Sequence, residues 1–331
     1  MVSTVFYKDL YIISRSTVAG EKEKQGPLGK FFDYYYLDQM AGKDSYEKGE
    51  SKMIKMAIDI ALKKAKLSKS NVELIVGGDL TSQLSSSNDA LKDFPTSFIG
   101  VYGACSTSIL STIVASSFVD NGLVINALSF ASSNYGSAER QFRYPNEYGV
   151  KKKQTATTTV TGCGTIILSK EKSKIKVVSS TIGQVINVNW DNINDMGSAM
   201  AYAAFDTIIN HLKNTKTTPE CYDLILTGDL SNVGSKVLYD LFKSDGIELN
   251  NYQDAGNLIF DIEKQTDIYS GGSGCACLAL TGYGYILDLM IEKKLKDVLL
   301  IGTGCLHSKI STAQKEKIPV IAHLIHLRRV G

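Results

Sequence analysis

The chain has 331 residues, of which 44% are hydrophobic and 21% are charged, and its formal net charge is +2. This length can bury a large core and favours two lobes, while the ordinary composition excludes disordered, collagen-like and disulfide-scaffold proteins. Because a net charge near zero gives no long-range attraction to polyanions, we expect no nucleic-acid partner.

The sequence has no pattern typical of a secreted or membrane-spanning chain. No stretch reaches about 18 uninterrupted apolar residues, as a transmembrane helix requires, and the start (MVSTVFYKDLYIIS) lacks the basic region and apolar run of a signal peptide. The six cysteines form no CxxC pair and the four histidines are scattered. We therefore expect reduced thiols, no metal site and a cytoplasmic location.

The first unit along the chain is a helix followed by a buried strand. In residues 50–66 (ESKMIKMAIDIALKKAK) the apolar residues fall close to one face, which predicts an amphipathic helix. Residues 73–80 (ELIVGGDL) are an apolar run that ends in Gly-Asp. They predict a buried strand whose C-terminal end delivers the carboxylate of Asp79 to a loop.

Further strands and a helix follow this unit. A strand-like run to Gly103 turns through Ala-Cys-Ser into a helix of small residues that extends to Val119. Apolar runs then predict strands over 123–130, 164–169 and 175–181.

The same order of elements returns in the second half of the chain. Residues 199–213 predict a helix, and residues 223–230 (DLILTGDL) are identical to 73–80 at five of eight positions. A glycine loop (SGGSGC), a helical stretch and a strand over 297–301 complete the repeat.

Helices that alternate with apolar strands predict an α/β fold in which helices cover both faces of the sheet. The doubling predicts two related halves, residues 1–170 and 171–331, with a seam between residues 165 and 200. The alternative is that two unrelated units resemble each other only because short strand ends are stereotyped.

The turn at Cys105 is the segment with the clearest chemical potential. A sharp turn from a strand into a helix can present a side chain, and the helix N-terminus favours a thiolate through its dipole and free N–H groups. This is the arrangement of a covalent nucleophile. Small apolar cysteines are, however, also common in protein cores, and the spacing does not separate the two interpretations.

Two other segments could bind an anion. The backbone N–H groups of the glycine loop around Gly272 could receive one, although such loops are also common connectors. Arg140 and Arg143 lie three residues apart with Phe142 between them, so they could fork around a carboxylate and bracket a planar ring; the alternative is a solvated charged turn. The lysine run 151–153 is interpreted as a solvated loop.

Eight segments in chain order resemble one known family over nearly the whole chain: GPLG, GGDL, VYGACSTS, AERQFRYPNEYG, TVTGCG, LTGDL, GGSGC and IPVIAH. They are similar to the stage V sporulation protein AD family, which belongs to the thiolase-like superfamily. The resemblance implies a duplicated, layered αβαβα fold that is usually dimeric.

The resemblance also implies a role. The family binds pyridine-2,6-dicarboxylic acid (dipicolinic acid) and helps to move it, with calcium, into the developing spore. The implied partners are dipicolinic acid, a second copy of the chain, and the other stage V sporulation A proteins at the spore inner membrane, where the chain would lie peripherally. No cofactor is implied beyond calcium that arrives with the ligand.

Thiolase-like condensing enzymes place a nucleophilic cysteine at the first elbow, and Cys105 matches that position. They also need a histidine on the loop after the second repeat strand, and a histidine or asparagine near the second elbow. Those places hold Asp229 and Gly272 here, with no histidine nearby in sequence. A thiol without such partners is poorly equipped for acyl transfer.

Three residues depart from the family pattern. Asn134 stands where the family has histidine, and asparagine cannot titrate near neutral pH. Cys305 and His307 stand where we expect alanine and leucine. In degradative thiolases a second cysteine approaches the first from such a loop, so this departure keeps a catalytic role open.

Two hypotheses follow. The first is a non-catalytic protein that binds a planar, doubly anionic ligand. The second is an acyltransferase that uses Cys105 as a thioester nucleophile. A third possibility, docking to membrane partners, runs alongside. For the first hypothesis the expected ligand-binding residues are Asp79, Cys105, Ser132, Ser133, Asn134, Arg140, Arg143, Asp229 and Gly272, and no residue is catalytic.

The two aspartates need a separate explanation, because a carboxylate repels an anion. Asp79 and Asp229 either hold their loops by accepting backbone N–H bonds, or meet a calcium ion carried by the ligand. We favour the first role, which is common for aspartate where a strand passes into a loop. Both roles predict that Asp79→Ala weakens binding.

Overall fold

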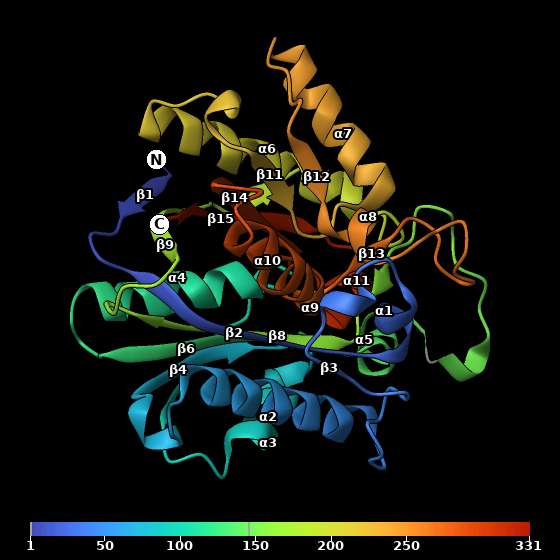
Figure 1. The fold of residues 1–331 in the computed structure, drawn as a ribbon. Coiled ribbons are helices and arrows are strands. Elements are labelled where there is room, and N and C mark those ends of the chain that lie inside the picture. Colours follow the sequence, from blue (N-terminus) through green and yellow to red (C-terminus); the bar gives the residue numbers. More distant parts are fainter. Residues whose placement is uncertain (1, 145) are drawn as a thin grey trace.

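Helices and sheets alternate in five layers (Figure 1). The computed structural model describes residues 2–144 and 146–331, so Pro145 of the arginine-rich motif lies outside the described residues. The layers confirm the predicted αβαβα arrangement. The outer helices of the first half are α2 (Tyr46–Ala65) and α3 (Ser85–Leu91), those of the second half are α6 (Met196–Thr215) and α7 (Ser231–Ser244), and the central layer contains α4 (Thr107–Asp120), α9 (Cys275–Leu280) and α10 (Leu287–Ile291).

The same strand order occurs twice. In the first half the strands lie side by side as β5-β4-β6-β8-β2, and in the second half as β12-β11-β14-β15-β9. Numbered along the chain, both orders read 3-2-4-5-1. Their bounds are β2 Tyr11–Ala19, β4 Leu74–Gly78, β5 Ser97–Gly100, β6 Asn126–Ser133, β8 Gly162–Ser169, β9 Ile175–Ile182, β11 Leu224–Thr227, β12 Tyr252–Asp254, β14 Asp297–Cys305 and β15 Pro319–Arg329.

The pairing of these strands places several loops at one edge of each sheet. β4 runs parallel to β5 and β6, and β11 runs parallel to β12 and β14, whereas β8 and β15 are antiparallel to their neighbours. The carboxyl ends of parallel strands meet at the same edge, which is where ligands bind in many α/β proteins. The loops after β4, β5 and β11 are therefore brought together.

The caps of the two long outer helices also correspond. Ser45 accepts a hydrogen bond from Lys48 N at 3.3 Å at the start of α2, and Asp195 accepts one from Ser198 N at 3.2 Å at the start of α6. These contacts satisfy backbone donors that have no partner inside the helix. Both helices end at a lysine in the left-handed conformation, Lys66 with φ +57° and Lys216 with φ +53°.

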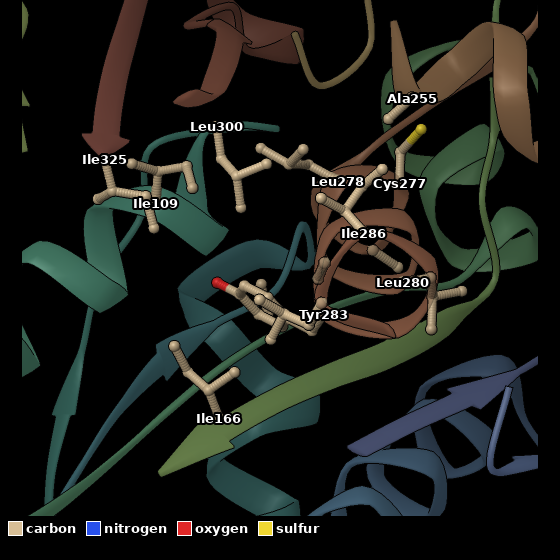
Figure 2. Packing of buried hydrophobic residues seen from close by; sticks show 14 of the residues in the cluster. Ile109, Ile166, Ala255, Cys277, Leu278, Leu280, Tyr283, Ile286, Leu300 and Ile325 are labelled. Carbon is tan, nitrogen blue, oxygen red and sulfur yellow. The ribbon is translucent and has the colours of Figure 1, made fainter. Parts of the chain in front are cut away.

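Each helical layer has its own apolar core. One cluster lies between α2 and the first sheet, one between α6 and the second sheet, and the largest fills the central layer. In the central cluster Ile109 of α4 and Leu278 of α9 approach Leu300 and Ile325 of the second sheet, while Tyr283 turns towards Ile166 of the first sheet (Figure 2). The centre of the molecule is therefore packed from both halves of the chain.

Two predicted elements differ from the structure. The strand expected over 123–130 begins only at Asn126, because Gly122 adopts φ +70° and the side chains of Leu123 and Ile125 are 68% and 70% exposed. The helical stretch after the glycine loop is not one α-helix. It is interrupted by a π-helix, η6 (Thr281–Ile286), which lies between α9 and α10.

None of the described helices is long and apolar enough to cross a bilayer.

Short elements complete the chain. The short strands are β1 (Ser3–Phe6), β3 (Tyr34–Tyr35), β7 (Thr158–Thr159), β10 (Ile186–Asn187) and β13 (Gly272–Ser273); the short helices are α1 (Glu21–Gln25), η1 (Gly29–Phe31), η2 (Lys69–Asn71), η3 (Ser82–Leu84), α5 (Tyr135–Phe142), η4 (Asn146–Tyr148), η5 (Pro219–Cys221), α8 (Ala255–Ile259) and α11 (Lys309–Ala313).

Candidate functional site

The turn before α4 presents Cys105 as the sequence predicted. Ala104 adopts φ +50°, a left-handed conformation that non-glycine residues rarely take. Two hydroxyls hold the turn: Ser106 Oγ donates to the Gly103 carbonyl at 2.6 Å, and Thr107 Oγ1 donates to the Ala104 carbonyl at 2.6 Å. A Cβ on Gly103 would lie 2.6 Å from Ser106 Oγ, so only glycine fits there.

Two loops of the second half meet Cys105 at this turn. Ser273, in the glycine loop, places its Oγ 3.7 Å from Cys105 Sγ. Asp229, on the loop after β11, accepts a hydrogen bond from Ser273 Oγ at 3.0 Å and another from the Thr303 hydroxyl. Asp229 is only 1% exposed. The structure therefore brings Cys105 and Asp229 together, and adds Ser273 and Thr303.

The surroundings of Cys105 favour the neutral thiol. Burial raises the pKa of Cys105 well above its ordinary value, and the negative charge of Asp229 raises it further. Burial also raises the pKa of Asp229 to about 6, although hydrogen bonds from Thr303, Cys105 and Ser273 oppose the shift. At neutral pH the carboxylate is thus mostly charged and the thiol protonated. The helix N-terminus favours the thiolate of Cys105, but burial and the charge of Asp229 favour the neutral thiol more strongly.

His307 lies on the wall of the same small cavity as Cys105. Its ring packs against Phe142 with centroids 5.2 Å apart, and its Nδ1 is buried without a hydrogen-bond partner. Burial lowers the pKa of His307, so the imidazole is neutral at pH 7. Among the described residues, no hydrogen bond joins His307 to Cys105. Cys305, on the same wall, directs its thiol to the Met196 carbonyl at 3.7 Å.

This inner cavity is small. Its volume is about 30 Å³, and a buried water needs roughly 10–15 Å³, so it has room for one or two waters. Its wall is mostly apolar. The lining residues are Leu80, Tyr102, Ala104, Cys105, Ala138, Phe142, Arg143, Thr159, Met196, Ser273, Gly274, Cys305 and His307.

The two predicted arginines point to different places. Arg143 has a side chain that is 9% exposed; its Nε donates to Glu139 Oε2 at 2.9 Å and its Nη2 to Glu139 Oε1, while its Nη1 is buried without a partner. Arg140 has a side chain that is 51% exposed and pairs with Glu47. Only Arg143 lines the inner cavity, so the pair does not fork around one ligand there.

The polar run at the end of β6 makes internal contacts. Ser132 Oγ donates to Glu50 at 2.7 Å, and Ser133 Oγ donates to the Val160 carbonyl at 2.6 Å. Asn134 caps α5 by accepting from Gly136 N at 2.9 Å. All three side chains are fully buried. The structure places them behind the cavity wall, and their predicted role in binding stays a prediction.

Asp79 holds its own loop, which is the role we favoured for it. The carboxylate accepts hydrogen bonds from the backbone N–H groups of Thr81 at 2.6 Å and Ser87 at 2.8 Å, and from both of their hydroxyls. Gly272 pairs with Thr158 in the short β13–β7 ladder, and a Cβ there would lie 2.7 Å from Ile259 Cγ2. Neither residue lines the inner cavity.

Sequence reasoning missed three residues near this site. Ser273 and Thr303 lie in the glycine loop and in the terminal Gly-Thr-Gly segment, but nothing in the sequence says that both face Asp229. Lys152 was interpreted as part of a solvated loop, and this is wrong. Its side chain is 16% exposed and its Nζ lies 3.2 Å from Glu139 Oε1. A run of three lysines carries no signal that its middle member turns inward.

A metal ion would need a cluster of suitable ligands. Among residues 2–144 and 146–331, no group of three or more His, Cys, Asp or Glu side chains is arranged to hold one.

Comparisons with known proteins agree with the fold and the motifs. A family model described as Stage V sporulation protein AD matches residues 2–328. Stage V sporulation protein AD of Bacillus subtilis is 42% identical over 328 residues, covering 99% of this chain and 96% of that protein.

Similar solved structures include 3-oxoacyl-[acyl-carrier-protein] synthase III from Aquifex aeolicus and a variant of OleA from Xanthomonas campestris. The first has a TM-score of 0.58 at 14% identity, covering 96% of this chain and 99% of that one. The second has a TM-score of 0.63 at 13% identity, covering 98% of each chain. At these identities the likeness establishes the thiolase-like fold alone.

Proposed function

The chain belongs to the stage V sporulation protein AD family and has a thiolase-like fold, and we propose that it binds dipicolinic acid without catalysis for uptake into the developing spore. The ligand enters as the free acid or as its calcium chelate. The observation that carries the non-catalytic part is the contact between Cys105 and the buried Asp229.

Acyl transfer needs a thiolate and donors for a developing oxyanion. Here Ser273 Oγ lies 3.7 Å from the sulfur of Cys105, and it donates to the buried carboxylate of Asp229. Burial and the charge of Asp229 keep the thiol protonated, and Ser273 already donates its proton to Asp229. The cysteine of the ancestral site thus remains in place without groups that would activate it.

Arg143 is the side chain that best supports binding of a carboxylate ligand. It is nearly buried, carries a donor without a partner, and lies on the wall of the cavity beside Cys105. A buried guanidinium binds carboxylates strongly because the bond is charge-assisted and little water competes. Its pairing with Glu139 leaves Nη1 free for a ligand.

Titration calorimetry with dipicolinate tests the proposal. We expect Arg143→Ala to weaken binding on the order of 10- to 100-fold, because a desolvated charge-assisted bond is lost. Arg140→Ala is the matched control, since Arg140 is exposed and does not line the inner cavity. Thermal unfolding verifies that both variants fold. Absence of binding by the wild type at millimolar ligand would refute the function.

The acyltransferase alternative has one observation in its favour, the unpartnered Nδ1 of His307 on the wall of the same cavity as Cys105. Intact-mass spectrometry after incubation with an acyl-coenzyme A separates the two functions. We expect no adduct and no turnover. An acyl adduct on Cys105 that later turns over would establish the enzyme, and Cys105→Ala locates any adduct.

We also propose a homodimer that lies peripherally at the spore inner membrane with other stage V sporulation A proteins. One observation supports self-association: β5 is an edge strand of the first sheet, and its backbone can pair with another strand. Light scattering of the purified chain measures the mass, and a monomer at micromolar concentration would refute the dimer.

A further inference from the structure

Three segments of the chain meet at the end of the molecule that lies opposite Cys105. They are the turn between β8 and β9 with the start of β9 (residues 170–176), the turn before β14 (residues 292–297) and the end of β15 (residues 328–331). Val330 N donates to the Lys174 carbonyl at 2.8 Å, and Arg329 N donates to the Lys296 carbonyl at 2.8 Å. Figure 1 shows the C-terminus beside β9 at this end. We call this surface the basic end because of its charge.

The basic end carries more positive charge than the whole chain. Residues 170–176 include four lysines and one glutamate, residues 292–297 include three lysines and two acids, and residues 328–331 include two arginines. Two further carboxylates lie nearby: Asp223 accepts from Lys296 N at 2.6 Å, and Glu73 accepts from Ile125 N at 2.9 Å in the adjoining loop. The basic end thus has nine cationic and five acidic side chains, whereas the whole chain has 36 and 34. The rest of the molecule is therefore slightly acidic.

Most of the cations at the basic end have no carboxylate partner. Asp297 is paired with Arg328 Nε at 2.6 Å, and Glu292 is paired with Lys294 at 2.8 Å. Among the described residues, no ion pair joins any of the four lysines of residues 170–176 to a carboxylate, and the first three of these lysines are exposed. Lysines that lie close together without counter-ions raise the local electrostatic potential, and this potential attracts a polyanionic surface.

Two large apolar side chains are exposed at the same end. Leu123 and Ile125, in the loop between α4 and β6, are 68% and 70% exposed. This loop adjoins the β8–β9 turn, because Asn126 pairs with Ser169 and a Cβ on Gly122 would lie 3.9 Å from Lys170 Nζ. A single exposed apolar side chain is ordinary. Two in one loop, beside unpaired lysines, are typical of surfaces that enter the headgroup region of a membrane, where apolar groups leave water and cations meet phosphates.

We propose that the basic end binds an anionic phospholipid bilayer, with Leu123 and Ile125 inserted among the lipid headgroups and the lysines of residues 170–176 beside the lipid phosphates. A nucleic acid or an acidic protein would satisfy the lysines but would leave the two apolar side chains in water, so only the bilayer suits both kinds of side chain. The inference rests on the proposed peripheral location, for which it names the surface and the partner, and it does not depend on the ligand.

The orientation that follows leaves the site beside Cys105 uncovered. β11 and β14 are parallel strands. Asp229, at the site, comes after the carboxyl end of β11, whereas Lys296, at the basic end, comes before the amino end of β14. The two surfaces therefore lie at opposite edges of the sheet, and a bilayer that contacts one of them does not contact the other.

Co-sedimentation of the full chain with lipid vesicles tests the proposal. We expect the chain to sediment with vesicles of phosphatidylcholine mixed with phosphatidylglycerol, and to stay in solution with phosphatidylcholine alone. Salt should release it, because the screening length falls from about 10 Å at 0.1 M to about 3 Å at 1 M. A wild type that does not sediment with the mixed vesicles at low salt overturns the proposal.

A triple variant locates the contact. Replacing Lys170, Lys172 and Lys174 by glutamine should lower the affinity for the mixed vesicles on the order of 10- to 100-fold, because each lysine near an anionic surface contributes to binding. The matched control replaces Lys43, Lys236 and Lys315, which are exposed and lie outside the basic end, and it should bind as the wild type does. Equal losses in the two variants would overturn the assignment to the basic end. Thermal unfolding verifies that both variants fold.

Fluorescence tests the insertion. The chain has one tryptophan, Trp190, which lies between β10 and α6. Leu123→Trp adds a second at the basic end, and we expect brominated lipids in the mixed vesicles to quench the added fluorescence while the wild type is not quenched. A variant that sediments without this quenching would show that the lysines hold a polyanion with no insertion, and would overturn the bilayer in favour of a nucleic acid or an acidic protein.

Calorimetry with dipicolinate keeps this inference separate from the proposed function. We expect the triple lysine variant to bind dipicolinate as the wild type does, since its changes lie at the opposite edge of the sheet from Cys105. A chain that binds dipicolinate but no vesicles removes the membrane surface alone. A chain that binds vesicles but no dipicolinate removes the proposed ligand and leaves the membrane surface in place.

Discussion

The two Gly-Asp-Leu strand ends have the same sequence and different contacts. Asp79 accepts four hydrogen bonds from Thr81, in the loop that follows it, and from Ser87, near the start of the next helix α3. Asp229 instead contacts Ser273 and Thr303, which are distant in sequence. One copy of the motif thus supports the local chain, and the other copy lies at the cavity beside Cys105.

In the second half another residue accepts the backbone hydrogen bonds of the loop that follows the strand. Asp254, at the end of the neighbouring strand β12, accepts hydrogen bonds from Leu230 N at 3.0 Å and Ser231 N at 2.8 Å, the two residues that follow Asp229. The backbone donors of this loop therefore remain satisfied, as buried donors must be. Because Asp254 takes over this work, Asp229 is free to face Cys105.

The strongest test of this comparison is stability. Asp79→Ala leaves two buried N–H groups and two hydroxyls without their acceptor, and we expect the free energy of unfolding to fall by about 3–4 kcal/mol. Asp229→Ala leaves no backbone N–H of its own loop unsatisfied, so its loss should be smaller, about 1–2 kcal/mol. Urea unfolding measures both. Equal losses would contradict the division of roles.

The next test concerns pH, because Asp79 lies close to a second buried acid. Burial raises the pKa of Glu50 to about 8, and the charge of Asp79 adds to the shift. A folded pKa above the unfolded value of 4.5 means that the folded state holds the proton more tightly. Stability from this group is therefore full below about pH 4.5 and is lost as the pH rises towards 8.

Glu50→Gln removes this titration while keeping an acceptor for Ser132. We expect its loss of stability between pH 5.5 and pH 8 to be smaller than that of the wild type, by on the order of 1–3 kcal/mol. Urea unfolding at the two pH values measures the difference. Burial raises the pKa of Asp229 to about 6 and that of Asp254 to about 7, so both proteins still lose some stability as the pH rises. An equal loss of stability in the two proteins would show that the pKa of Glu50 is not raised by folding.

The smallest expected effect is on thiol reactivity. Burial raises the pKa of Cys105 and the charge of Asp229 raises it further, so Asp229→Asn should lower this pKa and accelerate alkylation by iodoacetamide at pH 8. Mass spectrometry follows the rate, and Cys105→Ser assigns the modified site. Asp254→Asn serves as the comparison, since Asp254 accepts hydrogen bonds from Leu230 N and Ser231 N rather than contacting Cys105. No acceleration would mean that burial alone protects the thiol.

Much of the fold was predictable because it depends on local patterns. Apolar runs located β4 and β11, amphipathic spacing located α2, and the repeated Gly-Asp-Leu motif indicated the duplication and, with it, the helix that became α6. The start of β6 was predicted three residues early, because Leu123 and Ile125 are apolar but exposed. The π-helix within the second central helix left no sequence signal; its Tyr283 hydroxyl donates to the Ser108 carbonyl of α4 at 3.0 Å, a contact that the sequence does not announce.

The sequence by itself determined the family, the layered fold and the turn that presents Cys105, because these follow from short motifs and from the periodicity of apolar residues. Only the tertiary structure decided which side chains face that cysteine. The contact of Cys105 with Ser273 joins the two halves, while the pairing of Arg140 with Glu47 and the inward turn of Lys152 towards Glu139 depend on how elements of the first half pack. Burial and charge, which set each pKa, exist only after that packing.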